Sequence, residues 1–89
     1  MKRLLPLGTI VKLKEETDKI MIVSRLVRKE RNGEIFDYCG CLVPQGIQNP
    51  NNVVIFNHED VNRLLFIGFQ DEQEIEYSYT ISNLDRKEL

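Results

Sequence analysis

The chain has 89 residues, which indicates one domain over residues 1–89 with a single core and no room for a deep enclosed cavity. Its apolar fraction of 42% and charged fraction of 29% are ordinary for a globular protein, and no apolar run reaches the roughly 18 residues that a membrane span needs. The net charge is −2 and the basic residues are dispersed, which argues against a duplex nucleic-acid partner.

The start of the chain places two basic residues before a short apolar stretch, as a secretory signal does. Pro6 and Gly8 interrupt that stretch, charged residues follow it, and no small-residue cleavage site is present. We therefore expect a cytoplasmic protein.

Alternating apolar and polar residues predict three strands that form an antiparallel meander. These strands span Thr9–Lys14, Lys19–Glu30 and Glu34–Val43. The last two are joined by Asn32-Gly33, a pair typical of a type I′ turn with two central residues. In that register the facing pairs are Arg31–Glu34, Arg28–Asp37 and Val27–Tyr38.

Both faces of this predicted hairpin are half apolar, which a flat sheet with one wet side does not explain. One face carries Met21, Val23, Val27, Phe36, Tyr38 and Leu42, and the other carries Ile20, Ile22, Leu26, Ile35, Cys39, Cys41 and Val43. Three explanations stay open: a strongly coiled strand, a bulge near Ser24-Arg25, or a second layer over the outer face.

Cys39 and Cys41 are the only cysteines and lie two residues apart on a predicted strand. That spacing suits a disulfide poorly, and two thiols with a single histidine do not make a structural zinc site. We interpret both as buried, reduced thiols and expect no cofactor.

Pro44–Asn52 is the longest stretch of turn residues and carries one large apolar side chain, Ile47. Two interpretations remain: the loop contacts a partner, or it crosses from one sheet edge to the other. A fourth strand, Val53–Phe56, follows the loop. Either the first or the fourth strand is then a free edge that can accept a strand from a partner.

Asn57-His58-Glu59-Asp60 could in principle bind a metal or supply an acid–base pair. We favour a structural interpretation, in which Asn57 caps a short helix over His58–Leu65 and the acids complement the helix dipole. The apolar spacing of Val61, Leu64 and Leu65 supports that helix, and Phe66–Phe69 then forms a last short strand.

The C-terminal segment fits two structures. Ile75, Tyr77, Tyr79 and Ile81 alternate with polar residues, as in a strand. Asp71 and Glu74 resemble a capping pair, and acids precede bases along the segment, which favours a helix.

Together these elements predict an α+β protein: an antiparallel sheet of four or five strands curled as a small, partly open barrel, with one short helix before the last strand and a C-terminal helix. No serine, cysteine or histidine has a visible base and orienting group, and the glycines form no phosphate-binding loop. We therefore expect a protein that is not an enzyme.

Several segments occur in an order that resembles a known family. They are Leu5–Val11, Lys19–Ile22, Phe36–Gly40, Pro44–Gly46, Phe56–Val61 and Phe66–Phe69. From about Leu5 to Asp71 the chain resembles the domain-of-unknown-function family 4176 of Gram-positive bacteria. The resemblance implies a cytoplasmic protein, often encoded beside toxins exported by the type VII secretion system, that ends in an acidic helical segment. The family has no assigned catalytic residues.

From the resemblance and the lack of catalytic motifs we expect a non-enzymatic accessory, an adaptor or chaperone, that binds a secreted toxin or the toxin's small helical partners. A toxin immunity protein and a small barrel that binds nucleic acid are the alternatives. The candidate partner-binding residues are Tyr38, Pro44, Gly46, Ile47, His58 and Glu59.

Overall fold

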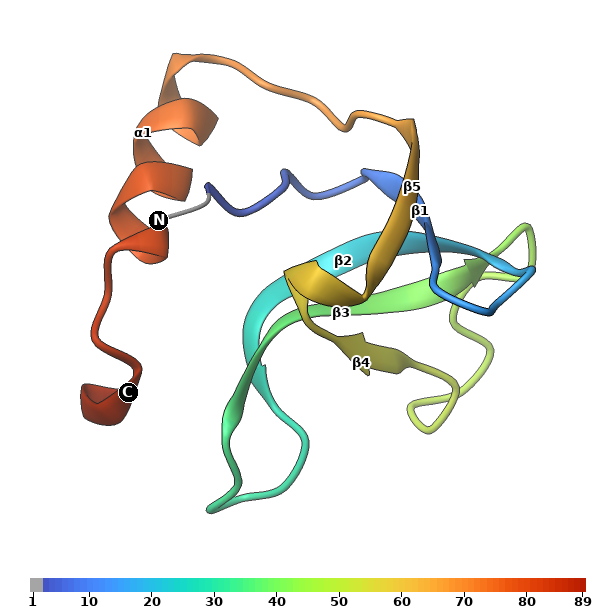
Figure 1. Cartoon of the computed structure of the whole chain (residues 1–89), viewed down its shortest axis with the longest axis horizontal. Coiled ribbons are helices and arrows are strands. Elements are labelled where there is room, and N and C mark those ends of the chain that lie inside the picture. Colours follow the sequence, from blue (N-terminus) through green and yellow to red (C-terminus); the bar gives the residue numbers. More distant parts are fainter. Residues whose placement is uncertain (1–2) are drawn as a thin grey trace.

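The computed structural model describes residues 3–89, which form one antiparallel sheet and an α-helix (Figure 1). The strands are β1 (Ile10–Leu13), β2 (Lys19–Arg28), β3 (Ile35–Val43), β4 (Val54–Phe56) and β5 (Val61–Phe66), and the helix is α1 (Glu72–Ser82). Two 3-10 turns, η1 (His58–Asp60) and η2 (Arg86–Glu88), complete the described elements. No helix within residues 3–89 is long and apolar enough to cross a membrane.

The strand order β4-β3-β2-β1-β5 makes the first four strands a meander, and β5 returns to pair with β1. The predicted α+β class, the antiparallel sheet and the C-terminal helix are confirmed. The sheet is not closed into a barrel, because β4 and β5 end it on either side without pairing with each other. The sequence left either the first or the fourth strand as a free edge. The fourth strand, β4, is at an edge of the sheet, whereas the first strand, β1, lies between β2 and β5.

The predicted register of the β2–β3 hairpin is wrong by two residues. Val27 pairs with Phe36 and Arg28 pairs with Ile35, and Gly33 N donates to Glu30 O at 3.0 Å to close a longer loop. Gly33 does not have the positive φ that a type I′ turn requires. A shift of two residues keeps every side chain on the same face, so the apolar pattern does not distinguish the two registers.

A bulge in β2 explains why both hairpin faces are half apolar. The pairing shifts between Ile22, opposite Gly40, and Ser24, opposite Cys39, at the position where the sequence allowed a bulge. Beyond the shift, Arg25 pairs with Tyr38 and so moves to the face that carries the buried Ile22.

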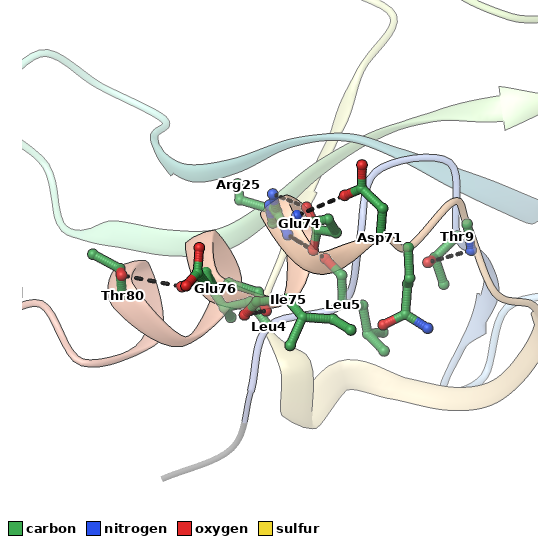
Figure 2. Close-up of polar contacts among 12 residues, drawn as sticks. Leu4, Leu5, Thr9, Arg25, Asp71, Glu74, Ile75, Glu76 and Thr80 are labelled. Carbon is green, nitrogen blue, oxygen red and sulfur yellow. Dashed lines mark hydrogen bonds and ion pairs between the residues drawn. The ribbon is translucent and has the colours of Figure 1, made fainter.

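The core lies between this face of the sheet, the N-terminal segment and α1. Its buried members are Leu4, Val11, Ile20, Ile22, Tyr38, Phe56 and Ile81. Helix α1 begins where Asp71 accepts a hydrogen bond from Glu74 N at 2.8 Å, as the capping pair predicted. Figure 2 shows a second contact of Glu74: the two terminal nitrogens of the Arg25 guanidinium donate to its carboxylate, at 2.9 and 2.8 Å. This pair ties α1 to β2.

The predicted helix before the last strand is present only as the 3-10 turn η1, and its predicted extent to Leu65 is wrong because β5 begins at Val61. Leu13 pairs with Val61 and Val11 pairs with Leu64, with a register shift between them. The shift inserts one extra residue in β5, so two side chains of the same face lie three positions apart, which imitates helical spacing. The predicted last strand is also displaced, since β5 ends at Phe66.

Candidate functional site

The η1 turn is held by backbone and side-chain contacts on both sides. Asp60 reaches back to accept the backbone N–H of Asn57 at 2.8 Å, and Asp60 N donates to Asn57 O at 2.9 Å. Asn57 is the N-cap of the turn and forms a capping box with Asp60, and its side-chain oxygen also accepts the backbone N–H of Asp37 at 3.0 Å. Asn57 therefore precedes the helical turn as predicted, and it also joins that turn to β3.

Tyr38 lies at the centre of this arrangement and is fully buried. Its hydroxyl accepts the backbone N–H of Leu5 at 2.9 Å and lies 2.6 Å from Nδ1 of His58. Burial raises the pKa of Tyr38 to about 12, so the phenol keeps its proton at neutral pH. Tyr38 holds three segments together and has no surface with which to contact a partner.

Asp37 extends the network toward the C-terminus. It is 8% exposed, and one carboxylate oxygen accepts the backbone N–H of His58 at 2.7 Å while the other accepts from the Arg86 guanidinium. The strand β3 and the turns η1 and η2 thus meet at one side chain. The predicted pairing of Asp37 with Arg28 is absent from the observed register, and Arg28 donates instead to Gly33 O at 2.5 Å.

An open cleft of about 850 Å³ lies beside this network. Its lining comprises Leu4, Arg28, Glu34, Ile35, Asp37, Asn57, His58, Glu59, Ser82, Arg86 and Lys87. Acidic and basic side chains are mixed along it, so its charge selects neither an anion nor a cation. Within residues 3–89, no group of three histidine, cysteine or carboxylate side chains is placed to hold a metal ion.

Of the six residues predicted to bind a partner, His58 and Glu59 line the cleft and three lie in the loop between β3 and β4. In that loop Pro44 and Ile47 are exposed, and Gly46 has a φ of +76° while its N–H donates to Leu42 O at 2.7 Å. The loop joins neighbouring strands, so the interpretation that it crosses between sheet edges is wrong. None of the loop residues lines the cleft.

The sequence analysis missed a group of exposed apolar side chains along and beside β5, which we call the apolar strip. It comprises Leu7, Leu64, Leu65, Phe66, Ile67 and Phe69. Phe66 is 60% exposed and Phe69 is 76% exposed. The run of four consecutive apolar residues from Leu64 was the available signal, but its exposure depends on β5 being an edge strand.

Gly68 brings the two parts of the apolar strip together. Its N–H donates to the hydroxyl of the buried Thr9 at 3.0 Å, and a Cβ at this position would lie 2.0 Å from Leu7 O. Only glycine permits so close a backbone approach. Leu7 therefore lies beside the segment that follows β5.

The two cysteines lie on β3, as predicted, and both are free thiols. Cys41 is buried and Cys39 is half-buried. Burial, with a smaller contribution from the neighbouring Cys41, raises the pKa of the Cys39 thiol, which lowers its reactivity as a nucleophile.

The fold and surface thus describe a small α+β protein with an apolar sheet edge and a mixed-charge cleft. The family model described as Domain of unknown function (DUF4176) matches residues 4–77, and the chain belongs to this family. The match confirms the resemblance that the sequence indicated. No curated protein and no solved structure matches the chain.

Proposed function

We propose that this protein is a non-enzymatic, cytoplasmic accessory, an adaptor or chaperone, for a toxin that a Gram-positive bacterium exports by type VII secretion. The observation that carries the binding function is the apolar strip on an edge strand. Exposed apolar side chains gathered along one segment often mark a binding site. The toxin as partner rests on the gene neighbourhood that the family resemblance implies.

The polar network beside the cleft supports a scaffold role for the histidine and acid cluster. The contacts of Asp37, Tyr38 and His58 join β3, η1, η2 and the N-terminal segment. Such a network fixes a fold because each buried polar group has a partner. The exposed surface is then the part of the molecule available to another protein.

Co-expression with the toxin encoded beside this gene tests the proposal. A tagged toxin should retain the protein through size-exclusion chromatography, and Phe69→Ser should weaken the complex roughly tenfold or more, because burying a phenylalanine stabilises by about 1.5–3 kcal/mol. Ile47→Ser is the matched control, since Ile47 is 53% exposed but lies in the β3–β4 loop. Failure to recover any complex contradicts the proposal. Loss of binding in Ile47→Ser alone moves the site to the loop.

The two halves of the toxin separate an adaptor from an immunity protein. An adaptor should bind the N-terminal export region, whereas an immunity protein should bind the C-terminal toxic domain and rescue cells that express it. Rescue of such cells would therefore replace the adaptor role by immunity.

Nucleic acid is the second candidate partner, because exposed Phe66 lies on the same strand as the exposed Arg63 and can stack on bases. Titration with single-stranded RNA at low and high salt tests whether the partner is a nucleic acid. Electrostatic contacts dominate such binding at low salt, so lack of binding there removes this alternative.

A further inference from the structure

We propose that the free edge of β5 takes up an extended segment of the protein partner as an added strand, and that this segment carries acidic and apolar side chains. The proposal rests on the protein-binding function above and names the site, the binding mode and the chemistry of the partner.

The edge strand β5 is exposed to solvent. β5 pairs with β1 on one side only, so a row of its backbone N–H and C=O groups faces no strand of the sheet. Proteins usually protect such an edge with charges, proline, bulges or a covering element. β5 has one charged residue and no proline, its pairing with β1 is shifted at two positions, and all of its six residues except Val61 are exposed. Six residues are the length of an ordinary strand.

The other sheet edge is a poorer acceptor. β4 has only three residues, and its last residue, Phe56, is 3% exposed. A strand added there would gain few backbone hydrogen bonds and no apolar side-chain contact with Phe56. The longer and more exposed β5 is therefore the edge that favours strand addition.

Two like charges face each other beside this edge. Lys12 of β1 pairs directly with Arg63 of β5, and like charges in facing positions destabilise a sheet. The ion pairs within residues 3–89 are Arg25–Glu74 and Arg86–Asp37, so the described part of the chain supplies no ion-paired carboxylate to Lys12 or Arg63. An acidic side chain on an added strand, next to Arg63, would offset this repulsion.

The apolar part of the partner follows from the cross-strand pairs. Paired side chains share a face, and the pair next to Lys12–Arg63 on one side is Val11–Leu64, whose Val11 is fully buried. Arg63 therefore points to the solvent side, and Leu64 to the core side, where it is still 47% exposed. An added strand would place a side chain beside each, acidic on one face and apolar on the other.

The same charges argue against a second copy of this chain as the occupant. Pairing β5 with β5 of another copy about a two-fold axis would bring two Arg63 side chains, each with its Lys12, to one short ladder. This would add like charge where the single chain already has an excess. An acidic and apolar segment of another protein fits the edge better.

The experiment uses fluorescein-labelled peptides of about eight residues, the length of a strand, in which valine alternates with glutamate or with lysine. Fluorescence anisotropy with the full chain should show the glutamate peptide binding roughly fivefold or more tightly than the lysine peptide. Arg63→Glu should remove or reverse this preference. Arg31→Glu, which makes the same charge change in the exposed β2–β3 loop, should leave it unchanged.

Amide NMR spectra of the complex locate the binding. Addition of the glutamate peptide should shift the amides of β5 and slow their hydrogen exchange, while the amides of β4 stay unchanged. Equal affinity for the two peptides, a preference that survives Arg63→Glu, or shifts confined to β4 or the cleft would each overturn the proposal. So would a dimer of the free protein whose β5 amides are already protected from exchange.

The toxin complex separates failure of this proposal from failure of the proposed function. If the wild-type chain retains the toxin and Arg63→Glu retains it equally, strand addition beside Arg63 is wrong while the accessory function stands. If the wild-type chain binds the peptide but no toxin, the toxin as partner is wrong while the edge remains a peptide site.

Discussion

The ion pair between Arg25 and Glu74 is expected to hold α1 on the sheet, and Glu74→Gln tests this. The two side chains are 6% and 14% exposed, and both guanidinium nitrogens donate to the carboxylate. The glutamine keeps one acceptor oxygen but places an NH₂ group against the donors of Arg25 and leaves its charge unpaired. Removing one partner of a buried pair costs about 3–5 kcal/mol, and the retained hydrogen bond reduces this to about 2–3 kcal/mol.

The assay is urea unfolding followed by far-UV circular dichroism, with the free energy of unfolding obtained by linear extrapolation. For a domain of this size, a loss of 2–3 kcal/mol also lowers the midpoint of thermal unfolding by roughly 10–20 °C. Glu76→Gln is the matched control on the same helix, because Glu76 is exposed and its loss should cost less than about 0.5 kcal/mol. Equal stabilities of the two variants would refute the role of the ion pair.

The double variant Arg25→Met with Glu74→Met supplies a second check. An apolar pair of similar volume removes both buried charges, so its cost should be smaller than the sum of the two single changes by about 1 kcal/mol or more. Additive costs would show that the two side chains stabilise the fold independently.

The remaining predictions concern three further sites. Gly68→Ala should lower the free energy of unfolding by about 2 kcal/mol or more, because the alanine Cβ would lie 2.0 Å from Leu7 O. Gly33→Ala is the control: its Cβ would have its nearest neighbour at 3.4 Å, so the free energy of unfolding should change by less than about 0.5 kcal/mol. Thermal unfolding measures both variants. The pKa of Tyr38 is raised from 10.0 to about 12, so the stability that its neutral form contributes is present below about pH 10 and is lost as the pH rises toward 12. Over that range the free energy of unfolding of Tyr38→Phe, measured in urea, should fall less steeply with pH than that of the wild type. Equal slopes for the two proteins would contradict the raised pKa of Tyr38. Because the pKa of Cys39 is raised, a disulfide reagent should label it more slowly than free cysteine at neutral pH, and its labelling rate should increase as the pH rises. A labelling rate at neutral pH equal to that of free cysteine would contradict its burial.

Four of the five strands could be predicted from the sequence because they follow ordinary alternation. β2 begins at Lys19 and β3 ends at Val43, as the apolar pattern indicated. The hairpin register could not be predicted from Asn32-Gly33 alone. Asp37, predicted to pair with Arg28 across the hairpin, instead forms hydrogen bonds with His58 of η1 and with Arg86, and both residues are far away in the sequence.

β5 could not be predicted because its irregular pairing with β1 hides the alternation that marks a strand. Without β5 the edge of the sheet was misplaced, and the exposure of Phe66 and Phe69 could not be inferred. Partner binding by the six candidate residues stays a prediction, but the structure places each of them. His58 and Glu59 do line a cleft, whereas Tyr38, an aromatic residue on an inward face, is enclosed by the core.

The extent of the family match has a practical meaning for anyone who shortens this chain. The match ends at residue 77, inside α1, but Ser78 and Ile81 are buried, and Ser82 accepts the backbone N–H of Leu4 at 2.9 Å. A truncation at the family boundary would remove the second half of α1 and expose the core side chains that it covers. Expression trials of the isolated domain should therefore retain the chain through at least residue 82, because the last turn of α1 binds the N-terminal segment.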